Sequence, residues 1–534
     1  MKVPIFVVVA FAAVLSVSRA EANPDSIAAG SVPADIEAIF HKPIYKHAIW
    51  GLLVVALDTG RVQLNLGASY PFFIGSVRKV FSVGELLNQV GPAYRYNTSV
   101  YRRGPLDRAG VLHGDLILLA SGDLTMGGRT APDGTIAVSN FDHNEADSLG
   151  NAVLTRPNPL AGYMALAQQL ARRGIREVTG EVIIDDRLFQ PFNFRNEFYL
   201  RPIFVNDDVV DLIINPTVPG KQASVRWRPV SAALGVKNTL VTGHRGSKYT
   251  LQLEPELPRC IGRPACIAQV TGKLPKDFVP PLVTRFPLIQ TFRIVQPSSY
   301  ARTVLINALQ AAGVKIDAAQ VRGNPAYLLL PGKFYPPDTK LAELEGLPYS
   351  QDAKLILKVS YNIGADTSLL LFGLTQGVDN MADALEVERT NLRSRYGIAP
   401  GEYHFVDGSG GGPTTATNRA VTRMLVALSK RRTFPAFLDA LPILGEDGSL
   451  ASVTDFESDR TLAGAKGQVR AKTGTFVKGN LLKGQALGGY ITTRSGTDLA
   501  FELVVNNVEV SGLNDVIQVF QDEGTVSAIL WRDN

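Results

Sequence analysis

The chain reads Ile74-Gly-Ser-Val-Arg-Lys-Val-Phe-Ser-Val-Gly-Glu-Leu-Leu87 near its N-terminus. Apolar residues recur here at helical spacings, which predicts a largely buried helix that begins near Ser76. Free backbone N–H groups of the first turn would point toward Ser76, and Lys79 would lie on the same helix face one turn away. A lysine held among apolar residues and near a second cation has a lowered pKa, as a general base for a serine hydroxyl requires. The alternative is a serine cap followed by a solvated lysine.

Both ends of the chain predict pieces of one antiparallel sheet. Residues 50–68 read as a hairpin that turns at Asp58-Thr-Gly60. Near the C-terminus, residues 469–476, 484–493 and 498–506 read as successive strands, and a helical pattern follows at about 513–530. We therefore expect an α+β fold in which an antiparallel sheet is flanked by helices and the first and last quarters of the chain share one domain.

A length of 534 residues predicts about three domains. Residues 1–22 resemble a cleavable signal peptide, because an apolar run from Val3 to Val17 precedes Ala20-Glu-Ala22; an uncleaved anchor is the alternative, although the run is short for a membrane span. We assign residues 23–98 and 335–534 to the catalytic domain. Residues 99–334 are rich in β-like runs, with one clear helix at 162–173, and are expected to form an inserted, mainly β region of one or two subdomains.

Composition narrows the choice of partners and cofactors. Cys260 and Cys266 lie in a Gly- and Pro-containing segment and are expected to form a small disulfide loop in an oxidising compartment. The six histidines show no paired metal-ligand spacing, so no metal site is predicted. The formal charge of +5 over the whole chain does not indicate nucleic acid. That charge is compatible with an anionic polymer as partner, and a merely solvated surface explains it equally well.

Two further signatures follow Ser76-Val-Arg-Lys79 in chain order. Ser360-Tyr-Asn362 lies in a predicted turn between helices, where Ser360 could relay a proton and Asn362 could hold a substrate amide. Lys472-Thr-Gly474 lies on a predicted strand, where Gly474 leaves room for a peptide to add as an extra strand. Each motif alone also fits a plain turn or an ordinary edge strand.

In this order and context, the motifs resemble the class C low-molecular-mass penicillin-binding proteins, the D-alanyl-D-alanine carboxypeptidase/endopeptidase family of the penicillin-binding protein 4 type. The resemblance covers nearly the whole mature chain. One departure is Leu124, where the family usually has Pro, and the family's pocket for the stem-peptide side chain cannot be aligned around Asn196–Leu200. Further segments that resemble the family are Gly114–Thr125, Thr179–Phe189, Val406–Gly410, Gly445–Leu450 and Gly488–Ile491.

The resemblance implies a penicillin-recognising, transpeptidase-like domain that hydrolyses the D-Ala-D-Ala bond of peptidoglycan stem peptides in the periplasm. Ser76 would form the acyl-enzyme, Lys79 would accept its proton, and Ser360 and Lys472 would return a proton to the leaving group. β-Lactams would acylate Ser76, and no cofactor would be needed. The sequence sets neither the oligomeric state nor the balance of carboxypeptidase to endopeptidase activity. The predicted catalytic residues are Ser76, Lys79, Ser360, Asn362 and Lys472, and the predicted substrate-binding residues are Thr473, Gly474 and Thr475.

Three alternatives compete with this interpretation. A β-lactamase or esterase on the same scaffold is the nearest, although the long insertion and the absence of an obvious deacylating Glu motif count against it. A catalytically inert envelope-binding protein would keep the fold, but the motif residues are intact. An unrelated Ser-His-Asp hydrolase is the weakest alternative, because the chain has no Gly-x-Ser-x-Gly elbow.

Overall fold

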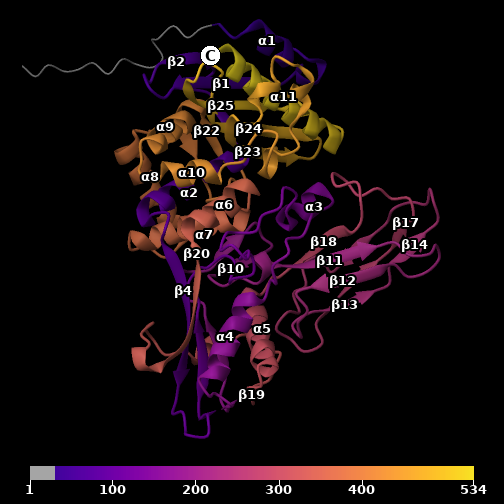
Figure 1. Cartoon of the computed structure of the whole chain (residues 1–534), viewed down its shortest axis with the longest axis vertical. Helices are drawn as coiled ribbons and strands as arrows, with labels where there is room; N and C mark the ends of the chain where they lie inside the picture. The colour runs from indigo at the N-terminus through magenta and orange to yellow at the C-terminus, as the bar shows by residue number, and fades with distance from the viewer. Residues whose placement is uncertain (1–30) are drawn as a thin grey trace, which may run out of the picture.

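A computed structural model describes residues 31–534 of the chain, so the predicted signal peptide at residues 1–22 lies outside the described residues. The first and last strands form one antiparallel sheet in the order β2-β1-β25-β24-β23, and β26 pairs with β24. Figure 1 shows the N-terminal strands, in indigo, beside the C-terminal strands and helix α11. The bounds are β1 Ile49–Ala56, β2 Val62–Leu66, β23 Val469–Lys478, β24 Leu481–Thr492, β25 Asp498–Asn506 and β26 Val508–Glu509.

Each face of this sheet has its own apolar core, because successive side chains of a strand point to opposite faces. Leu487 and Ile491 of β24 pack in one core with residues of α11 (Leu513–Asp533) and α1 (Ala34–Phe40). Ala486 and Tyr490 of the same strand pack in the other core, with α9 (Asn418–Ser429) and α2 (Lys79–Val90). Helices therefore cover both faces, and the predicted α+β class is confirmed.

The helix predicted from Ser76 begins as a 3-10 turn at Gly75–Arg78 and continues as α2. All its apolar side chains from Val80 to Leu87 are buried, as their spacing predicted. Helix α2 packs against α6 (Tyr349–Lys358) and α7 (Asn362–Thr375). Two further helices complete this layer, namely α8 (Met381–Tyr396) and α10 (Phe434–Ala440), and a small sheet at its edge contains β3 (Pro71–Phe73), β21 (Tyr403–His404) and β22 (Thr415–Thr417).

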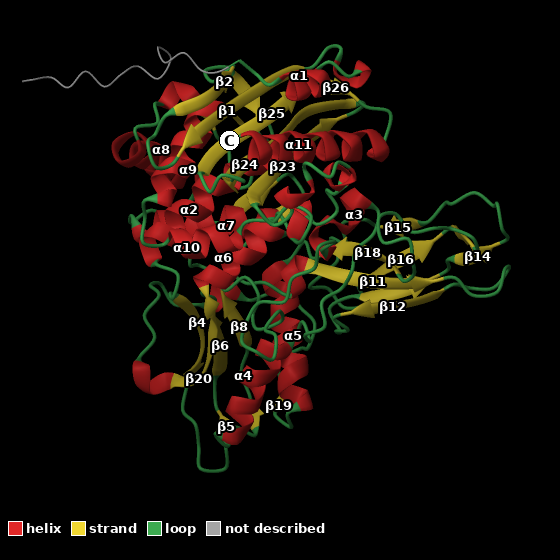
Figure 2. Ribbon diagram, turned by 45° about the horizontal axis from the view of Figure 1, so that its top comes forward, coloured by secondary structure: helices red, strands yellow, loops and turns green. Residues whose placement is uncertain are grey.

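A second sheet, in the order β20-β4-β6-β8, lies below this layer in Figure 2. Its outer strand β20 (Lys340–Pro348) pairs with β4 (Arg95–Arg103), so the chain leaves and re-enters the helical layer on adjacent strands. Helices α4 (Ala161–Arg172) and α5 (Pro297–Ala311) pack on each other beside it. The sequence predicted only one helix in this part, at residues 162–173, which is α4. It did not predict α5. The remaining strands here are β5 Val111–Leu112, β6 Asp115–Leu119, β7 Glu177–Val178, β8 Val182–Asp185 and β19 Lys315–Ile316.

Residues 209–293 form further small sheets that extend sideways in both views (Figures 1 and 2). The first has the order β12-β11-β18, with β11 Val209–Asn215, β12 Ser224–Arg228 and β18 Leu288–Arg293. The segment between these strands carries the Cys260–Cys266 disulfide, with an S–S distance of 2.04 Å, which confirms the predicted pairing. It also contains β13 Gly235–Asn238, β14 Val241–Gly243, β15 Gln252–Glu254, β16 Ile267–Thr271 and β17 Lys273–Pro275.

A short hairpin, β9 (Phe192–Phe194) and β10 (Phe198–Leu200), and helix α3 (Ala146–Leu149) lie between these sheets and the helical layer (Figure 1). Within residues 31–534, none of the helices is both long enough and apolar enough to span a membrane. We propose, as the sequence suggested, that residues 99–334 are an insertion into one catalytic domain formed by residues 23–98 and 335–534.

Candidate active site

Three distant motifs meet where the 3-10 turn Gly75–Arg78 lies against strand β23. The Lys79 Nζ is 2.6 Å from the Ser76 Oγ and 3.4 Å from the Ser360 Oγ. The Lys472 Nζ lies 3.0 Å from the same Ser360 Oγ. The amino groups of two lysines therefore lie beside a pair of serine hydroxyls.

Two more oxygens surround the Lys79 amine. Its Nζ is 2.7 Å from the Asn362 Oδ1 and 2.9 Å from the Ser409 carbonyl oxygen. A neutral lysine amine has two N–H bonds and one lone pair. When the N–H bonds are donated to Asn362 and Ser409, the lone pair is left for the proton of the Ser76 hydroxyl. The geometry thus suits Lys79 as the group that activates Ser76.

The electrostatics favour the neutral form of this lysine. Burial, followed by the nearby Arg195 cation, lowers the pKa of Lys79 to about 7, against the opposing charges of Glu145, Asp366 and Asp407. Burial and the charge of Lys79 also hold the pKa of Lys472 well below its ordinary value. The sequence predicted a second cation beside Lys79, and the structure adds a third, Arg195.

Close backbone packing fixes the distance between the strand and the turn. A Cβ on Gly474 would lie 2.0 Å from the Ile74 carbonyl oxygen, and a Cβ on Gly75 would lie 2.7 Å from the Thr475 backbone nitrogen. Only glycine permits this approach at either position. The backbone N–H groups of Ser76 and Thr475 are thereby held on adjacent segments, which is the arrangement expected of an oxyanion hole.

The turn that carries Ser360 is held in an uncommon conformation. Ser360 has a φ of +64°, in the left-handed region, between the end of α6 and the start of α7. A non-glycine residue in this region costs about 1 kcal/mol. The turn places the Ser360 hydroxyl between the two lysines and lets Asn362, the first residue of α7, reach Lys79.

The loop after β21 is part of the site and not merely a turn. The Asp407 carboxylate accepts hydrogen bonds from the backbone N–H groups of Ser409 at 3.0 Å and Gly410 at 2.7 Å. This holds the Ser409 carbonyl toward Lys79. Burial and the charge of Asp407 raise the pKa of Asp366 to about 8, and Asp366 accepts the Gly408 N–H.

Arg78, between the two motif residues Ser76 and Lys79, joins this loop to the helices. Its fully buried side chain donates to the Asp407 carbonyl at 2.9 Å and to the Glu388 carboxylate at 2.6 Å. Its guanidinium also lies 4.1 Å from the centre of the Phe405 ring. The side chain therefore positions the loop rather than facing solvent.

Sequence reasoning missed two charged residues at the site, Arg195 and Glu145. Arg195, in the β9–β10 turn, donates to the Ser409 Oγ at 3.2 Å. Glu145 ends the 3-10 turn His143–Glu145, and its charge acts on both Lys79 and Lys472. Both line a cavity of about 270 Å³ that also reaches Asn362. No motif could have identified them, because both come from residues 99–334 and meet the site only through tertiary contacts.

The predicted substrate-binding residues lie along the same strand. Thr473 is buried and its Oγ1 is 2.7 Å from the Ser449 Oγ, whereas Thr475 is exposed and donates to the Gln485 side chain at 2.9 Å. On one edge β23 pairs with β24, and at the start of the other edge Val469 and Ala471 bond to the backbone of Leu444 and Pro442. Beyond Ala471, this second edge has no strand partner among the described residues. An extended peptide could add along that edge.

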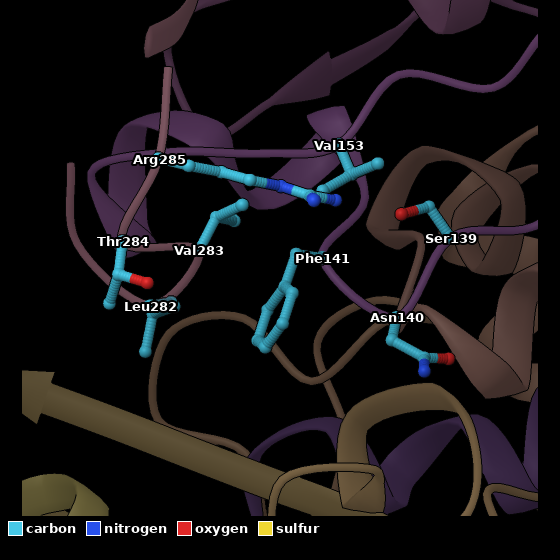
Figure 3. Close-up of a pocket in the computed structure, with 8 residues that line it drawn as sticks. All are labelled: Ser139, Asn140, Phe141, Val153, Leu282, Val283, Thr284 and Arg285. Atoms are coloured by element: carbon cyan, nitrogen blue, oxygen red, sulfur yellow. The ribbon is translucent and has the colours of Figure 1, made fainter. Parts of the chain in front are cut away.

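A shallow pocket of about 510 Å³ lies between residues 139–153 and residues 282–285 (Figure 3). The Phe141 ring lies in its middle, and the Arg285 side chain extends across it toward Val153. Arg285 is its one ionisable lining residue, so no lining carboxylate or imidazole could act as a base toward the Ser139 or Thr284 hydroxyl.

Among the described residues, one group has metal-ligand geometry, namely Asp142, His143 and Asp207. The Arg129 guanidinium already donates to both carboxylates of this group. The two ring nitrogens of His143 lie 2.7 Å from Asp211 and 2.9 Å from Asp207. Although burial opposes it, the carboxylates of Asp211, Asp142 and Asp207 raise the pKa of His143 to about 10, which favours the charged form of the ring. Two organic cations occupy the position that a metal would take.

Comparison with known proteins agrees with this geometry. The family described as the D-Ala-D-Ala carboxypeptidase 3 (S13) family matches residues 32–522. The D-alanyl-D-alanine carboxypeptidase of Actinomadura sp. (strain R39) is 24% identical over 513 residues, which cover 92% of this chain and 84% of the relative. The crystal structure of penicillin binding protein 4 from Haemophilus influenzae superposes with a TM-score of 0.68 at 17% identity, over 94% of this chain and 100% of that one. The same Haemophilus protein in complex with a β-lactam gives a TM-score of 0.66 at 18% identity, with the same coverage. The fold is therefore the penicillin-recognising one.

Proposed function

The chain belongs to the D-Ala-D-Ala carboxypeptidase 3 (S13) family, so it is a serine D,D-peptidase, and we propose that Ser76 is its nucleophile. One observation carries this assignment: the Ser76 hydroxyl lies 2.6 Å from a lysine whose pKa is lowered to about 7. A serine needs an adjacent base at neutral pH, and Lys79 is such a base.

Acylation begins when Ser76 Oγ attacks the carbonyl carbon of the penultimate D-alanine. The Lys79 amine takes the hydroxyl proton, and the N–H groups of Ser76 and Thr475 stabilise the oxyanion. The peptide C–N bond then breaks, and the leaving D-alanine nitrogen receives a proton through Ser360 and Lys472. The 3.0 Å contact between these two side chains supports the relay.

Water completes the reaction by hydrolysing the ester on Ser76. The substrate lies along the free edge of β23, with its terminal carboxylate near Lys472, Thr473 and Thr475. Gly474 keeps the strand flat against the turn, so the scissile carbonyl can reach both oxyanion donors. No step requires a metal or an organic cofactor.

Peptidoglycan stem peptides are the proposed substrates and β-lactams the proposed inhibitors. The latter follows because a β-lactam presents a strained amide to the same nucleophile. We place the enzyme in the periplasm after removal of residues 1–22. The Cys260–Cys266 disulfide supports an oxidising compartment.

The test compares wild type with Ser76→Ala on a fluorescent penicillin and on a D-Ala-D-Ala peptide. We expect the wild type to be labelled and to release D-alanine, and Ser76→Ala to do neither. Lys79→Met should be as inactive as Ser76→Ala, because both residues act as one unit. Labelling of Ser76→Ala at the wild-type rate would contradict the assignment.

Glu145 supports a second candidate, a β-lactamase on the same scaffold, because its carboxylate lies in the cleft and acts on both lysines. In this case, water would release the penicilloyl group rapidly, and Glu145→Gln would prolong the lifetime of the label. A label that persists for many peptide turnovers in the wild type would exclude this candidate.

A further inference from the structure

Positive charge is concentrated in one part of the molecule, residues 216–287, which we call the outer lobe. It contains eleven Lys and Arg against three Asp and Glu, a net charge of +8, whereas the whole chain has +5. The rest of the chain is therefore net negative. Within the outer lobe, all of which the structure describes, Arg228 is the one cation that forms an ion pair, with Asp211.

The cations are most crowded where β14 pairs with β17. Three backbone segments, residues 217–221, 241–250 and 272–279, meet there, and we call them the lobe tip. Hydrogen bonds join them: the Thr242 N–H donates to the Lys221 carbonyl at 2.8 Å, the Lys276 N–H to the Gly243 carbonyl at 3.1 Å, and the Thr250 N–H to the Lys273 carbonyl at 3.0 Å. The exposed cations of the lobe tip are Lys221, Arg245, Lys248, Lys273 and Lys276.

Only one acidic residue, Asp277, lies among these cations, and both of its carboxylate oxygens accept the Gly246 N–H, at 3.1 and 3.0 Å. Like charges gathered without counter-charges repel one another and create a strong positive potential. Figures 1 and 2 show β14 at the end of the outer lobe that lies farthest from helix α2. The lobe tip can therefore bind a partner while the active site holds a peptide.

We propose that the lobe tip is a docking surface for the polyanionic wall polymer itself, through the free carboxylates of its stem peptides. The identity of this polymer rests on the proposed function. The polymer carries carboxylates at regular intervals, so it offers many binding sites for the lobe tip. Binding there would raise the local concentration of scissile peptides near the active site without any new contact at Ser76.

A polymer fits this surface better than a lipid membrane does. The exposed apolar side chains at the lobe tip are Val218 and Val279, and the half-exposed Tyr249 ring stacks on Phe278 with a centroid distance of 4.5 Å. Interfacial anchors use large projecting apolar side chains, and neither the valines nor a stacked ring supplies one. Exposed cations also continue along the outer lobe at Arg226, Lys237, Arg259, Arg263 and Arg285, as an extended partner requires.

The experiment measures co-sedimentation of the full chain with insoluble peptidoglycan from which other polymers have been removed. Ser76→Ala is the background, so that the polymer is not degraded. The test variant carries Lys221→Gln, Lys248→Gln and Lys273→Gln. The control carries Lys46→Gln, Lys333→Gln and Lys430→Gln, three lysines that are also exposed and lie outside the outer lobe.

We expect the test variant to bind about tenfold more weakly than the background protein, since each exposed charge pair contributes modestly, and the control to bind as the background does. Binding should also weaken as salt is added. Equal binding by test and control variants would overturn the proposal. So would a charge-dependent preference for vesicles with anionic lipid, or for a phosphate polymer, over peptidoglycan.

A second readout separates this proposal from the proposed function. With Ser76 intact, the test variant should hydrolyse a small soluble D-Ala-D-Ala peptide at the wild-type rate, because none of its substitutions touches the active site. If the wild type fails to hydrolyse the peptide while the test variant still loses sedimentation, the proposed function fails and the docking surface stands.

Discussion

The chemistry of the site depends on whether the Lys79 amine carries its extra proton. An ordinary lysine with a pKa near 10.5 would be almost fully charged at pH 7 and could not accept a proton. Burial and the Arg195 cation lower the pKa of Lys79 to about 7. The contacts to Asn362 and Ser409 then orient the neutral amine toward Ser76.

The rate of acylation should therefore follow the deprotonation of Lys79. We expect the second-order rate constant for penicillin labelling to rise about tenfold per pH unit below pH 7 and to level off above it. In Arg195→Gln, the midpoint should move to higher pH, because the loss of a nearby cation favours the charged lysine. Stopped-flow labelling between pH 5 and 9 measures both profiles.

Arg226→Gln is the matched control for this prediction, since it removes the same charge from the outer lobe, and its profile should follow the wild type. A profile that does not change in Arg195→Gln would show that this guanidinium does not set the pKa of Lys79.

At the scale of elements, the site depends on how closely β23 approaches the turn before α2. Successive residues of a strand point to opposite faces, so Lys472 and Gly474 share the face toward the turn. Gly488 of β24 lies opposite Lys472 in the sheet register. A side chain at Gly474 would separate the strand from the turn, because its Cβ would meet the Ile74 carbonyl.

We therefore expect Gly474→Ala to lower the rate of penicillin labelling about 100-fold while the protein still folds, because a displacement of about 1 Å in an active site has an effect of that size. Labelling rate and the far-ultraviolet circular dichroism spectrum measure the two parts of the prediction.

Gly479→Ala, in the turn after the same strand, is the control. Gly479 has a φ of +60° and no neighbour within 4 Å of its added Cβ. This substitution should cost about 1 kcal/mol of stability and leave labelling unchanged. Equal labelling by both variants would mean that the approach of β23 to the turn is not critical.

At the scale of the whole molecule, a buried polar network joins segments that are distant in sequence. Arg129 binds Asp142 and Asp207, and His143 binds Asp207 and Asp211. The pKa of Asp207 lies below its ordinary range, since the charges of Arg129 and His143 outweigh the effect of burial. The Asn144 side chain also donates to Asp142 and Asp207, and Glu145 follows it in the chain, so the network positions one wall of the active-site cleft.

This network predicts that stability falls at alkaline pH. The folded-state pKa of His143 is about 10 against an ordinary value of 6.5, so its stabilisation is complete below pH 6.5 and is lost as the pH rises through 10. We expect His143→Gln to unfold at a lower temperature than wild type at pH 6, by a loss of about 3 kcal/mol. The difference should shrink by pH 10.

Thermal unfolding at both pH values measures this effect. His47→Gln is the control, because His47 is exposed and its replacement should change neither transition. A constant difference between His143→Gln and wild type at both pH values would mean that His143 is neutral in the folded protein.

The sequence by itself determined the central sheet, the helix after Ser76 and the order of the three motifs. Local patterns carried these features, because strand alternation, helical spacing and turn residues are properties of contiguous residues. Helix α5 escaped prediction although its residues are contiguous. It is buried nearly all round and begins with Pro297-Ser-Ser, so its apolar residues form no one-sided stripe.

Only the tertiary structure decided which charges surround Lys79. Arg195, Glu145, Asp366 and the Ser409 carbonyl come from four separate segments, and a pKa depends on distances across space and on exclusion of water. The net charge of residues 216–287 can be counted from the sequence, but only the structure brings the three segments of the lobe tip together. The motifs can be recognised from their order along the chain. The electric field at a site, in contrast, is a sum over every charge that the fold brings near it.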